Sequence, residues 1–309
     1  MNPIEELIEE YLNHSRAEGK GYKTVEGAYG YPLRKVFLPW CEREGVTEPS
    51  ALTIRVLERY QDDLLTKGGA RGPLSKASVH AYVRVVNQMV SWARSDPYMD
   101  AKLPNCKVKL PKLGRPVKNI LTREEILLLE DTAKAERDKL IVRVFGETGI
   151  RVGELLKLRF EDLVIQDRKR YLHVQGKGQL DRLVPIVDPT LWRRLERFVK
   201  RRPDKISGSR LFLGLKRRAG HDQLEPLTES GVQQMIRVLA HNAGLTKRVH
   251  PHLFRYSAAT WMRRKGLDPL TIARVMGWTS LRMLQDIYDQ SVSADDYDAM
   301  WRQLRSSDD

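Results

Sequence analysis

Five side chains of this sequence have the types and spacing to cleave a phosphodiester. His252 and Arg255 lie three positions apart, Trp278 and Tyr288 follow them, and Arg151 lies far upstream in a Thr-Gly-Ile-Arg turn. Two guanidinium groups and an imidazole can neutralise the non-bridging oxygens of a phosphate as it becomes five-coordinate, while a tyrosine hydroxyl attacks the phosphorus in line. The pattern therefore indicates strand transfer on a nucleic acid without a metal ion.

The composition also favours a nucleic-acid partner. The chain has 309 residues, with 54 Lys and Arg against 40 Asp and Glu, which gives a net charge of +14 and an isoelectric point near 9.7. A surplus of this size favours binding to a polyanion such as double-stranded DNA. Most of it lies in residues 111–309, at +12, whereas residues 1–110 carry +2. The length suits two domains, and 41% apolar residues are enough to form a core in each.

Cysteine content and hydropathy disfavour several protein classes. Cys41 and Cys106 lie far apart with no neighbouring ligand pattern, which disfavours a disulfide framework and a zinc site and fits a reducing cytoplasm. The first residues are acidic and amphipathic, and no stretch approaches the roughly eighteen consecutive apolar residues of a membrane span. We therefore expect a cytoplasmic, nucleoid-associated protein with no membrane partner, no metal and no other cofactor.

Residues 1–106 are predicted to form a small helical domain with no strand. Apolar residues recur at helical spacing in three stretches, which begin near Ile4, Ile54 and Val79. Glycine and proline interrupt the pattern between these stretches, at residues 19–21, 47–50 and 68–73. The first domain shows no catalytic constellation of its own.

Residues 107–118 are predicted to form a basic interdomain linker. Two prolines, a glycine and five cations forbid a continuous helix and favour an extended strap along DNA phosphates. An ordinary solvated linker fits the same composition, and scattered cations on helices usually serve solubility. The candidate DNA contacts, in chain order, are Lys76, Arg84, Lys107, Lys109, Lys112, Arg115 and Lys118.

A tight turn is predicted to hold Arg151. A capping box at Thr122 opens one helix, and Gly149 closes the next, so that Arg151 follows directly and is fixed by the backbone. Glu154, three residues on, could support Arg151 from behind. Taken alone, the simpler interpretations are a surface cation and a surface acid on a helix.

Residues 161–186 are predicted to form a three-stranded antiparallel meander. Lys177 lies between two glycines at a hairpin tip, where its ammonium could protonate a departing alkoxide as a general acid. A solvated Gly-Lys-Gly turn is the simpler interpretation. The residues that alternate with polar ones are Leu163, Ile165, Tyr171, His173, Leu183 and Pro185.

The C-terminal third, from Asp188 on, is predicted to be helical again. Pro251 sets the first turn of a helix, so that His252 and Arg255 project from one face toward a shared ligand. His250 precedes that helix as a cap or a structural histidine. Trp278 follows Gly277 at a turn where its indole N–H can point outward, although a core tryptophan is the simpler interpretation.

The nucleophile has to be chosen among the 11 tyrosines. Tyr288 lies on a short predicted helix, and Tyr256 and Tyr297 are the alternatives. Buried tyrosines are common, so only the position relative to the other motifs favours Tyr288.

Together these motifs resemble those of the tyrosine recombinases, also called phage-type integrases, in order and in spacing. The resemblance covers about residues 119–300. The helical segment before it is similar in size and position to the core-binding domain of Xer-like, two-domain members. A chance match to five ordered motifs is far rarer than a match to one. The motifs are Thr148-Gly-Ile-Arg-Val-Gly-Glu154, Gly176-Lys-Gly178, His250-Pro-His-Leu-Phe-Arg255 with Ser257-Ala-Ala-Thr260, Val275-Met-Gly-Trp278 and Ile287-Tyr288.

The resemblance implies a mainly α-helical fold with a small antiparallel β-sheet. Residues 1–106 would form a SAM-like core-binding domain that binds DNA, and residues 119–309 an α+β catalytic domain. Residues 293–305 would form a tail helix that docks on a neighbouring protomer, or else packs on its own core. Because the helical pattern starts at residue 4, no separate arm-binding domain is expected ahead of it.

The resemblance also implies a role for each site residue. Arg151 and Arg255 would bind the scissile phosphate, His252 would assist proton transfer, Lys177 would protonate the leaving 5′ oxygen, and Tyr288 would be the nucleophile.

Two further residues would act beside these five. Glu154 would support the site from behind. Trp278 stands where most members have histidine, although Cre-like members have tryptophan; its indole would donate one hydrogen bond to the phosphate and cannot shuttle a proton.

The implied activity is site-specific recombination through a 3′-phosphotyrosine, a free 5′-hydroxyl and a Holliday junction. It would proceed in a homo-tetramer on two duplexes, from a monomer or weak oligomer when free, without ATP or a divalent metal. A directionality or accessory factor stays open as a further partner.

Two alternatives share parts of this chemistry. A type IB topoisomerase-like enzyme would relax supercoils as a monomer, and a non-catalytic DNA-binding protein on the same fold would explain the charge. A metal-dependent nuclease is disfavoured, since no cluster of Asp and Glu accompanies the motifs.

Overall fold

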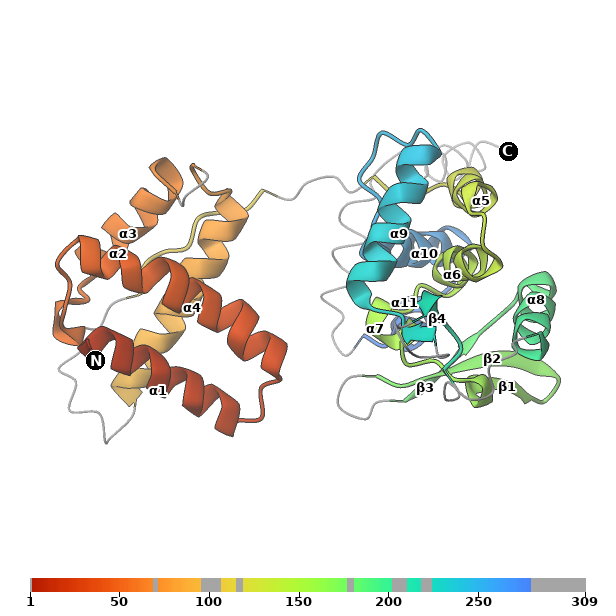
Figure 1. The fold of residues 1–309 in the computed structure, drawn as a ribbon, viewed down its shortest axis with the longest axis horizontal. Helices are drawn as coiled ribbons and strands as arrows, with labels where there is room; N and C mark the ends of the chain where they lie inside the picture. The colour runs from red at the N-terminus through yellow and green to blue at the C-terminus, as the bar shows by residue number, and fades with distance from the viewer. Residues whose placement is uncertain are drawn as a thin grey trace, which may run out of the picture. The chain divides into compact units, whose positions relative to one another are not determined.

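The chain folds into two compact units, Met1–Pro116 and Val117–Asp309 (Figure 1). The computed structural model describes residues 2–68, 72–95, 107–114, 119–176, 181–201, 210–217 and 224–278. As predicted, the fold is mainly helical with small antiparallel sheets. Within these described residues, no helix combines the length and the apolar character that a bilayer span requires.

The first unit is a helical cluster around an aromatic core. Phe37, Trp40 and Tyr60 are buried, and Tyr60 lies edge to face with the other two, with ring centroids 5.0 Å from Phe37 and 5.1 Å from Trp40. Such pairs add stabilisation beyond their buried area. The elements are α1 (Pro3–Ala17), the π-helical η1 (Lys23–Gly30) and η2 (Leu33–Phe37), α2 (Leu38–Arg43), the 3-10 turn η3 (Pro49–Ala51), α3 (Ile54–Thr66) and α4 (Lys76–Ser95).

The start of the basic segment 107–118 packs on the first unit. Val108 is buried, and Asn87 of α4 donates a hydrogen bond to its carbonyl at 3.0 Å and accepts one from its amide at 3.1 Å. Buried backbone N–H and C=O groups need such partners because no water can replace them. Lys107 and Lys109, on either side of Val108, are exposed.

The second unit combines seven helices of the described chain with two small sheets. Its elements are α5 (Arg123–Thr132), α6 (Glu136–Thr148), α7 (Val152–Leu155), η4 (Phe160–Asp162), β1 (Leu163–Gln166), β2 (Lys169–Val174), β3 (Arg182–Pro185), α8 (Pro189–Lys200), β4 (Leu213–Arg217), β5 (Leu224–Pro226), α9 (Glu229–Asn242), α10 (Pro251–Arg264) and α11 (Pro269–Met276).

The helix boundaries follow the predicted caps. Thr122 and Glu125 form the capping box of α5, and Asp188 and Thr228 cap α8 and α9 through their side chains. His250, predicted to be a cap or a structural histidine, occupies the N-cap position of α10, and within the described residues its side chain makes no capping bond.

The predicted meander is confirmed, but on β2 and β3 the residues that alternate with polar ones in the sequence do not form its buried face. Strands β1, β2 and β3 pair antiparallel in that order, and Asp167 and Arg168 at the first hairpin both have positive φ. The buried residues are Leu172, Val174 and Val184, and Leu163, which pairs with Leu172, packs on the same core, whereas Leu183 is exposed. Both series alternate along the strands, and the series that meets the helical core is the buried one.

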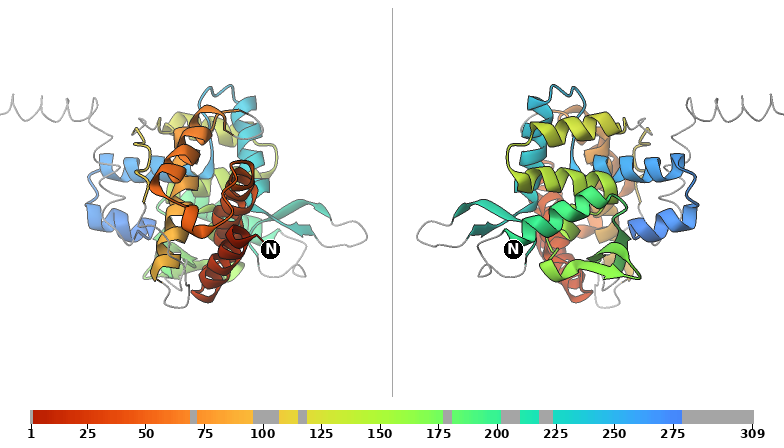
Figure 2. Two further views of the ribbon diagram at one scale, coloured as in Figure 1. Left: turned by 90° about the vertical axis from the view of Figure 1, so that its left-hand side faces the viewer. Right: turned by 90° about the vertical axis from the view of Figure 1, so that its right-hand side faces the viewer.

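A second hairpin was not predicted. Strands β4 and β5 pair antiparallel and project away from the helices (Figure 2), in a stretch that the sequence had suggested to be helical. The pattern is weak there because β4 consists of Leu213-Gly-Leu-Lys-Arg217, and its Leu215 is exposed. A short edge hairpin with little burial leaves almost no alternation to detect.

Helices α6 and α10 form the centre of the second unit. Phe145 of α6 and Phe254 of α10 are fully buried, with ring centroids 5.9 Å apart. The backbone at Leu121 is tied to α10, because its amide donates to Ser257 at 2.8 Å and its carbonyl accepts from the Trp261 indole at 3.2 Å. This packing places the ends of α6 and α10, with the candidate residues, side by side.

Candidate active site

The Arg151 turn is held by glycine geometry and close packing. Gly149 ends α6 in the left-handed conformation with φ +62°, and an added Cβ would lie 2.8 Å from the Met276 side chain and 3.0 Å from Ala258. Glycine is thus required both for its backbone conformation and for the approach of α10 and α11. Ile150 is fully buried, so the turn is anchored in the core just before Arg151.

Arg151 is fixed by the buried Glu154, as expected. The Glu154 carboxylate accepts the Arg151 backbone amide at 2.7 Å and its guanidinium at 2.8 Å. A second guanidinium nitrogen of Arg151 donates to the carbonyl of Gly277 at 3.1 Å. The Arg151 side chain remains 37% exposed, so its other N–H groups are available to a ligand.

Arg255 is buried and bridges two helix ends. It donates to the carbonyl of Gly149 at 2.7 Å and to the carbonyl of Met276. Burial, together with the charge of Arg151, lowers the pKa of the Arg255 guanidinium to about 9, so that it stays protonated at neutral pH. Two backbone anchors therefore hold a full positive charge in one orientation.

One cavity brings four of the predicted residues together. A hollow of about 320 Å³ is lined by Arg151, Glu154, His252 and Arg255. His252 is exposed on the first turn of α10, which Pro251 begins. Two guanidinium groups and an imidazole therefore line one hollow.

Trp278 does not point its indole N–H outward as predicted. Its Nε1 atom is buried and has no hydrogen-bond partner in the described part of the chain. The Arg255 guanidinium lies over the indole ring at 5.4 Å, and the ring packs against the cluster that contains Ala258 and Met276. Cation–π contact and apolar packing thus fix the ring with its N–H turned inward. Trp278 lines a neighbouring cavity of about 490 Å³, together with His252 and Arg255.

The sequence analysis missed Arg182, the first residue of β3. Its guanidinium donates to both oxygens of Glu154 at 2.9 Å, and its Nε donates to the carbonyl of Val275 at 2.9 Å. Arg182 lies on the same strand face as the buried Val184. The available signal was therefore a cation two positions from the apolar Val184 on one strand face.

Several other candidates are exposed or lie outside the described residues. Lys177, Tyr288, Arg115, Lys118 and the tail 293–305 belong to parts of the chain that the structure does not describe. Gln175, just before the Lys177 tip, lines the cavity of Arg151 and Arg255. Of the candidate DNA contacts, those described are all exposed: Lys76, Arg84, Lys107, Lys109 and Lys112.

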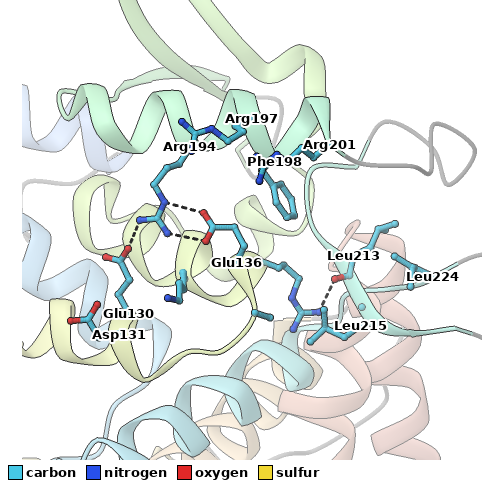
Figure 3. A pocket seen from close by; sticks show the side chains of 14 residues that line it. Glu130, Asp131, Glu136, Arg194, Arg197, Phe198, Arg201, Leu213, Leu215 and Leu224 are labelled. Carbon is cyan, nitrogen blue, oxygen red and sulfur yellow. Dashed lines mark hydrogen bonds and ion pairs between the residues drawn. The ribbon is translucent and has the colours of Figure 1, made fainter.

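A larger cavity of about 830 Å³ lies elsewhere on the second unit, between α5, α6, α8 and β4. Arg194 of α8 lies between Glu130 and Glu136 and is paired with both (Figure 3). Arg137 donates to the Leu213 carbonyl at 2.7 Å. The two arginines are thus bound to carboxylates and a carbonyl of the protein itself. None of the predicted catalytic residues lines this cavity. The smaller hollow at Arg151 is therefore the candidate active site.

The protonation of Glu154 gives the site a testable pH dependence. Burial would raise the pKa of this carboxyl, but hydrogen bonds from Arg182 and from the Arg151 amide hold it at about 2, below the ordinary 4.5. A folded-state pKa below the unfolded one stabilises the fold fully above pH 4.5, and this stabilisation is lost as the pH falls toward 2.

We expect Glu154→Gln to remove that dependence. The gap in unfolding free energy between wild type and Glu154→Gln should shrink by about 2 kcal/mol from pH 6 to pH 3. Urea unfolding of the second unit at both pH values measures it. An equal gap at the two pH values would show that Glu154 has the same pKa in the folded and unfolded chain.

Phosphoryl-transfer enzymes use sites of this kind, with a fixed pair of guanidinium groups beside an exposed imidazole, to bind a pentacoordinate phosphate.

Comparison with known proteins agrees with this class. The model of the phage integrase family matches residues 119–294. The tyrosine recombinase XerA of Pyrococcus horikoshii is 30% identical over 91% of this chain and 87% of its own length.

Solved structures show the same fold. The XerH site-specific recombinase, bound to a palindromic difH substrate in a post-cleavage complex, aligns with a TM-score of 0.72 at 18% identity and covers 96% of this chain and 84% of its own. A lambda integrase tetramer bound to a Holliday junction aligns with a TM-score of 0.69 at 17% identity and covers 94% and 79%.

The chain therefore belongs to the phage integrase family. It is a site-specific tyrosine recombinase, which sets aside the topoisomerase-like and binding-only alternatives.

Proposed function

We propose that this recombinase cuts and rejoins double-stranded DNA at a specific site, with Tyr288 as nucleophile. The observation that carries the proposal is the pair of anchored guanidinium groups, Arg151 and Arg255, that share one cavity with His252. These groups would bind the non-bridging oxygens of the scissile phosphate and stabilise the charge that develops during attack.

The proposed step breaks one P–O bond as it forms another. The Tyr288 oxygen bonds to phosphorus, its proton passes to His252, and the bond from phosphorus to the 5′ oxygen breaks. Lys177 would give the 5′ oxygen its proton, and the position of Gln175 at the cavity supports this role. The phosphotyrosine keeps the bond energy, so that the 5′-hydroxyl of another strand can reverse the reaction and join.

The assembly follows from the same chemistry. Exchange of strands between two duplexes requires two pairs of active sites, and we propose a homo-tetramer that passes through a Holliday junction. The lambda integrase tetramer on a Holliday junction, which shares the fold, supports this. Residues 1–106 would form the core-binding domain and 107–118 the linker, both on DNA, and the protein would act at the nucleoid. A directionality or accessory factor would control the outcome.

The test is a trapped covalent intermediate. Nicked duplexes drawn from the flanks of the native locus release the cleaved strand by diffusion, so wild-type protein should accumulate a protein–DNA adduct in excess EDTA. Peptide mapping should place the attached nucleotide on Tyr288. Tight binding without an adduct on every duplex would contradict the proposal and favour a protein that binds only. An adduct that appears only after addition of a divalent metal would contradict the metal-independent step.

A further inference from the structure

Three arginines converge on the C-terminal end of α11. The carbonyls of Val275, Met276 and Gly277 accept hydrogen bonds from Arg182, Arg255 and Arg151, respectively. The last carbonyls of a helix lack intrahelical partners and carry its negative dipole end, so cations bind there favourably. Arg151 and Arg255 have a proposed role in the phosphate site, and Arg182 has none.

Arg182 also neutralises the carboxylate that orients Arg151. It binds both Glu154 oxygens side by side at 2.9 Å, and its own side chain is 12% exposed. Glu154 in turn is 5% exposed and receives two hydrogen bonds from Arg151. The two parallel hydrogen bonds from Arg182 hold the carboxylate in a fixed plane and neutralise its charge. The positive charge of Arg151 is therefore not fully offset by Glu154 and can act on a bound phosphate.

The guanidinium of Arg182 also packs against the turn that leads to Trp278. Gly277 has φ +60°, and an added Cβ there would lie 2.8 to 3.0 Å from three atoms of that guanidinium. One side chain thus connects β3, the α7 turn and the end of α11, which are the elements that position the two phosphate-binding arginines.

We propose that Arg182 is a positioning residue for DNA cleavage, which neutralises Glu154 and fixes the end of α11 so that Arg151 and Arg255 can bind the phosphate. The inference rests on the proposed function. Without Arg182, the unneutralised Glu154 would bind Arg151 more tightly and add a negative charge near the substrate phosphate. Both effects oppose phosphate binding in the transition state more than they oppose binding of the duplex as a whole.

The test compares three properties of Arg182→Gln with those of wild type. The single-turnover rate of adduct formation should fall on the order of 100-fold, as for other losses of catalytic positioning. The affinity for the DNA site should not change, because phosphates along the whole duplex supply most of it. Arg194→Gln is the matched control, since Arg194 is also a partly buried arginine paired with carboxylates but lines the other cavity, which none of the candidate active-site residues lines. It should lower the melting temperature and leave the rate unchanged.

Two further variants separate positioning from a merely structural role. Adding Glu154→Gln to Arg182→Gln removes the unneutralised carboxylate, and the double variant should regain about tenfold in rate over Arg182→Gln. Arg182→Lys keeps the charge but loses the planar fork, so it should fold and lose about tenfold.

The outcomes distinguish the inference from the function on which it rests. Undiminished cleavage by Arg182→Gln or Arg182→Lys, beside an active wild type, would overturn the role of Arg182 alone. So would a rate loss in the Arg194→Gln control as large as that in Arg182→Gln, together with no recovery in the double variant. Absence of any adduct with wild type would overturn the proposed function and the Arg182 role with it.

Discussion

Tyr288→Phe is expected to abolish covalent attachment to DNA while the protein still binds its site. The substitution removes one hydroxyl, and phenylalanine has no atom that can bond to phosphorus. The guanidinium groups of Arg151 and Arg255 remain, so the duplex still binds. We expect the rate of adduct formation on nicked duplexes to fall on the order of 10⁴-fold or more, as for other lost nucleophiles. Gel shift measures the binding, and denaturing electrophoresis measures the adduct.

The controls are the two other tyrosines that the sequence left open. Tyr256 follows Arg255 directly on α10 and lines the cavity next to Trp278, which makes it the stronger competitor. Tyr297 lies outside the described residues. Tyr256→Phe and Tyr297→Phe should both retain the adduct. An adduct that survives in Tyr288→Phe and disappears in either control would assign the nucleophile to that residue.

The residues predicted best were those that local geometry dictates. Gly149 has to end a helix in the left-handed region, and Pro251 has to begin one, so the places of Arg151, His252 and Arg255 follow from backbone rules over a few positions. The capping box at Thr122 is equally local. Such signals survive in any tertiary context because the neighbouring residues alone enforce them.

The residues predicted worst depend on contacts between distant segments. The buried face of the meander is the one that meets the helical core. The sequence does not tell the two faces apart, because the residues of either face occupy every second position along a strand. Arg182 was missed for that reason, since its three partner groups lie on Glu154 and at Val275, far away in the chain. The inward indole of Trp278 likewise depends on Arg255. No local pattern specifies these pairings, although their chemistry is simple once the fold joins them.

Arg255→Lys is expected to inactivate cleavage although it keeps the positive charge. Arg255 reaches the carbonyls of Gly149 and Met276 at the same time, and it still has N–H groups for a phosphate. A lysine has one nitrogen, which cannot bridge two carbonyls and also bind a phosphate in a fixed plane. Loss of one such preorganised donor costs about 10²- to 10³-fold in the rate of the chemical step. Single-turnover adduct formation at saturating protein should show this loss.

The same substitution should also destabilise the second unit, and a control on the same helix separates the two effects. A lysine that leaves one buried carbonyl unpaired costs about 1–3 kcal/mol. Arg264, also on α10, lies over the Trp261 ring at 5.4 Å, as Arg255 lies over Trp278, but it is exposed. Arg264→Lys should therefore keep both the rate and the melting temperature. If Arg255→Lys were destabilised yet cleaved at the wild-type rate once folded, the bridge would hold the fold without acting on the phosphate, and the charge of Arg255 alone would suffice for catalysis.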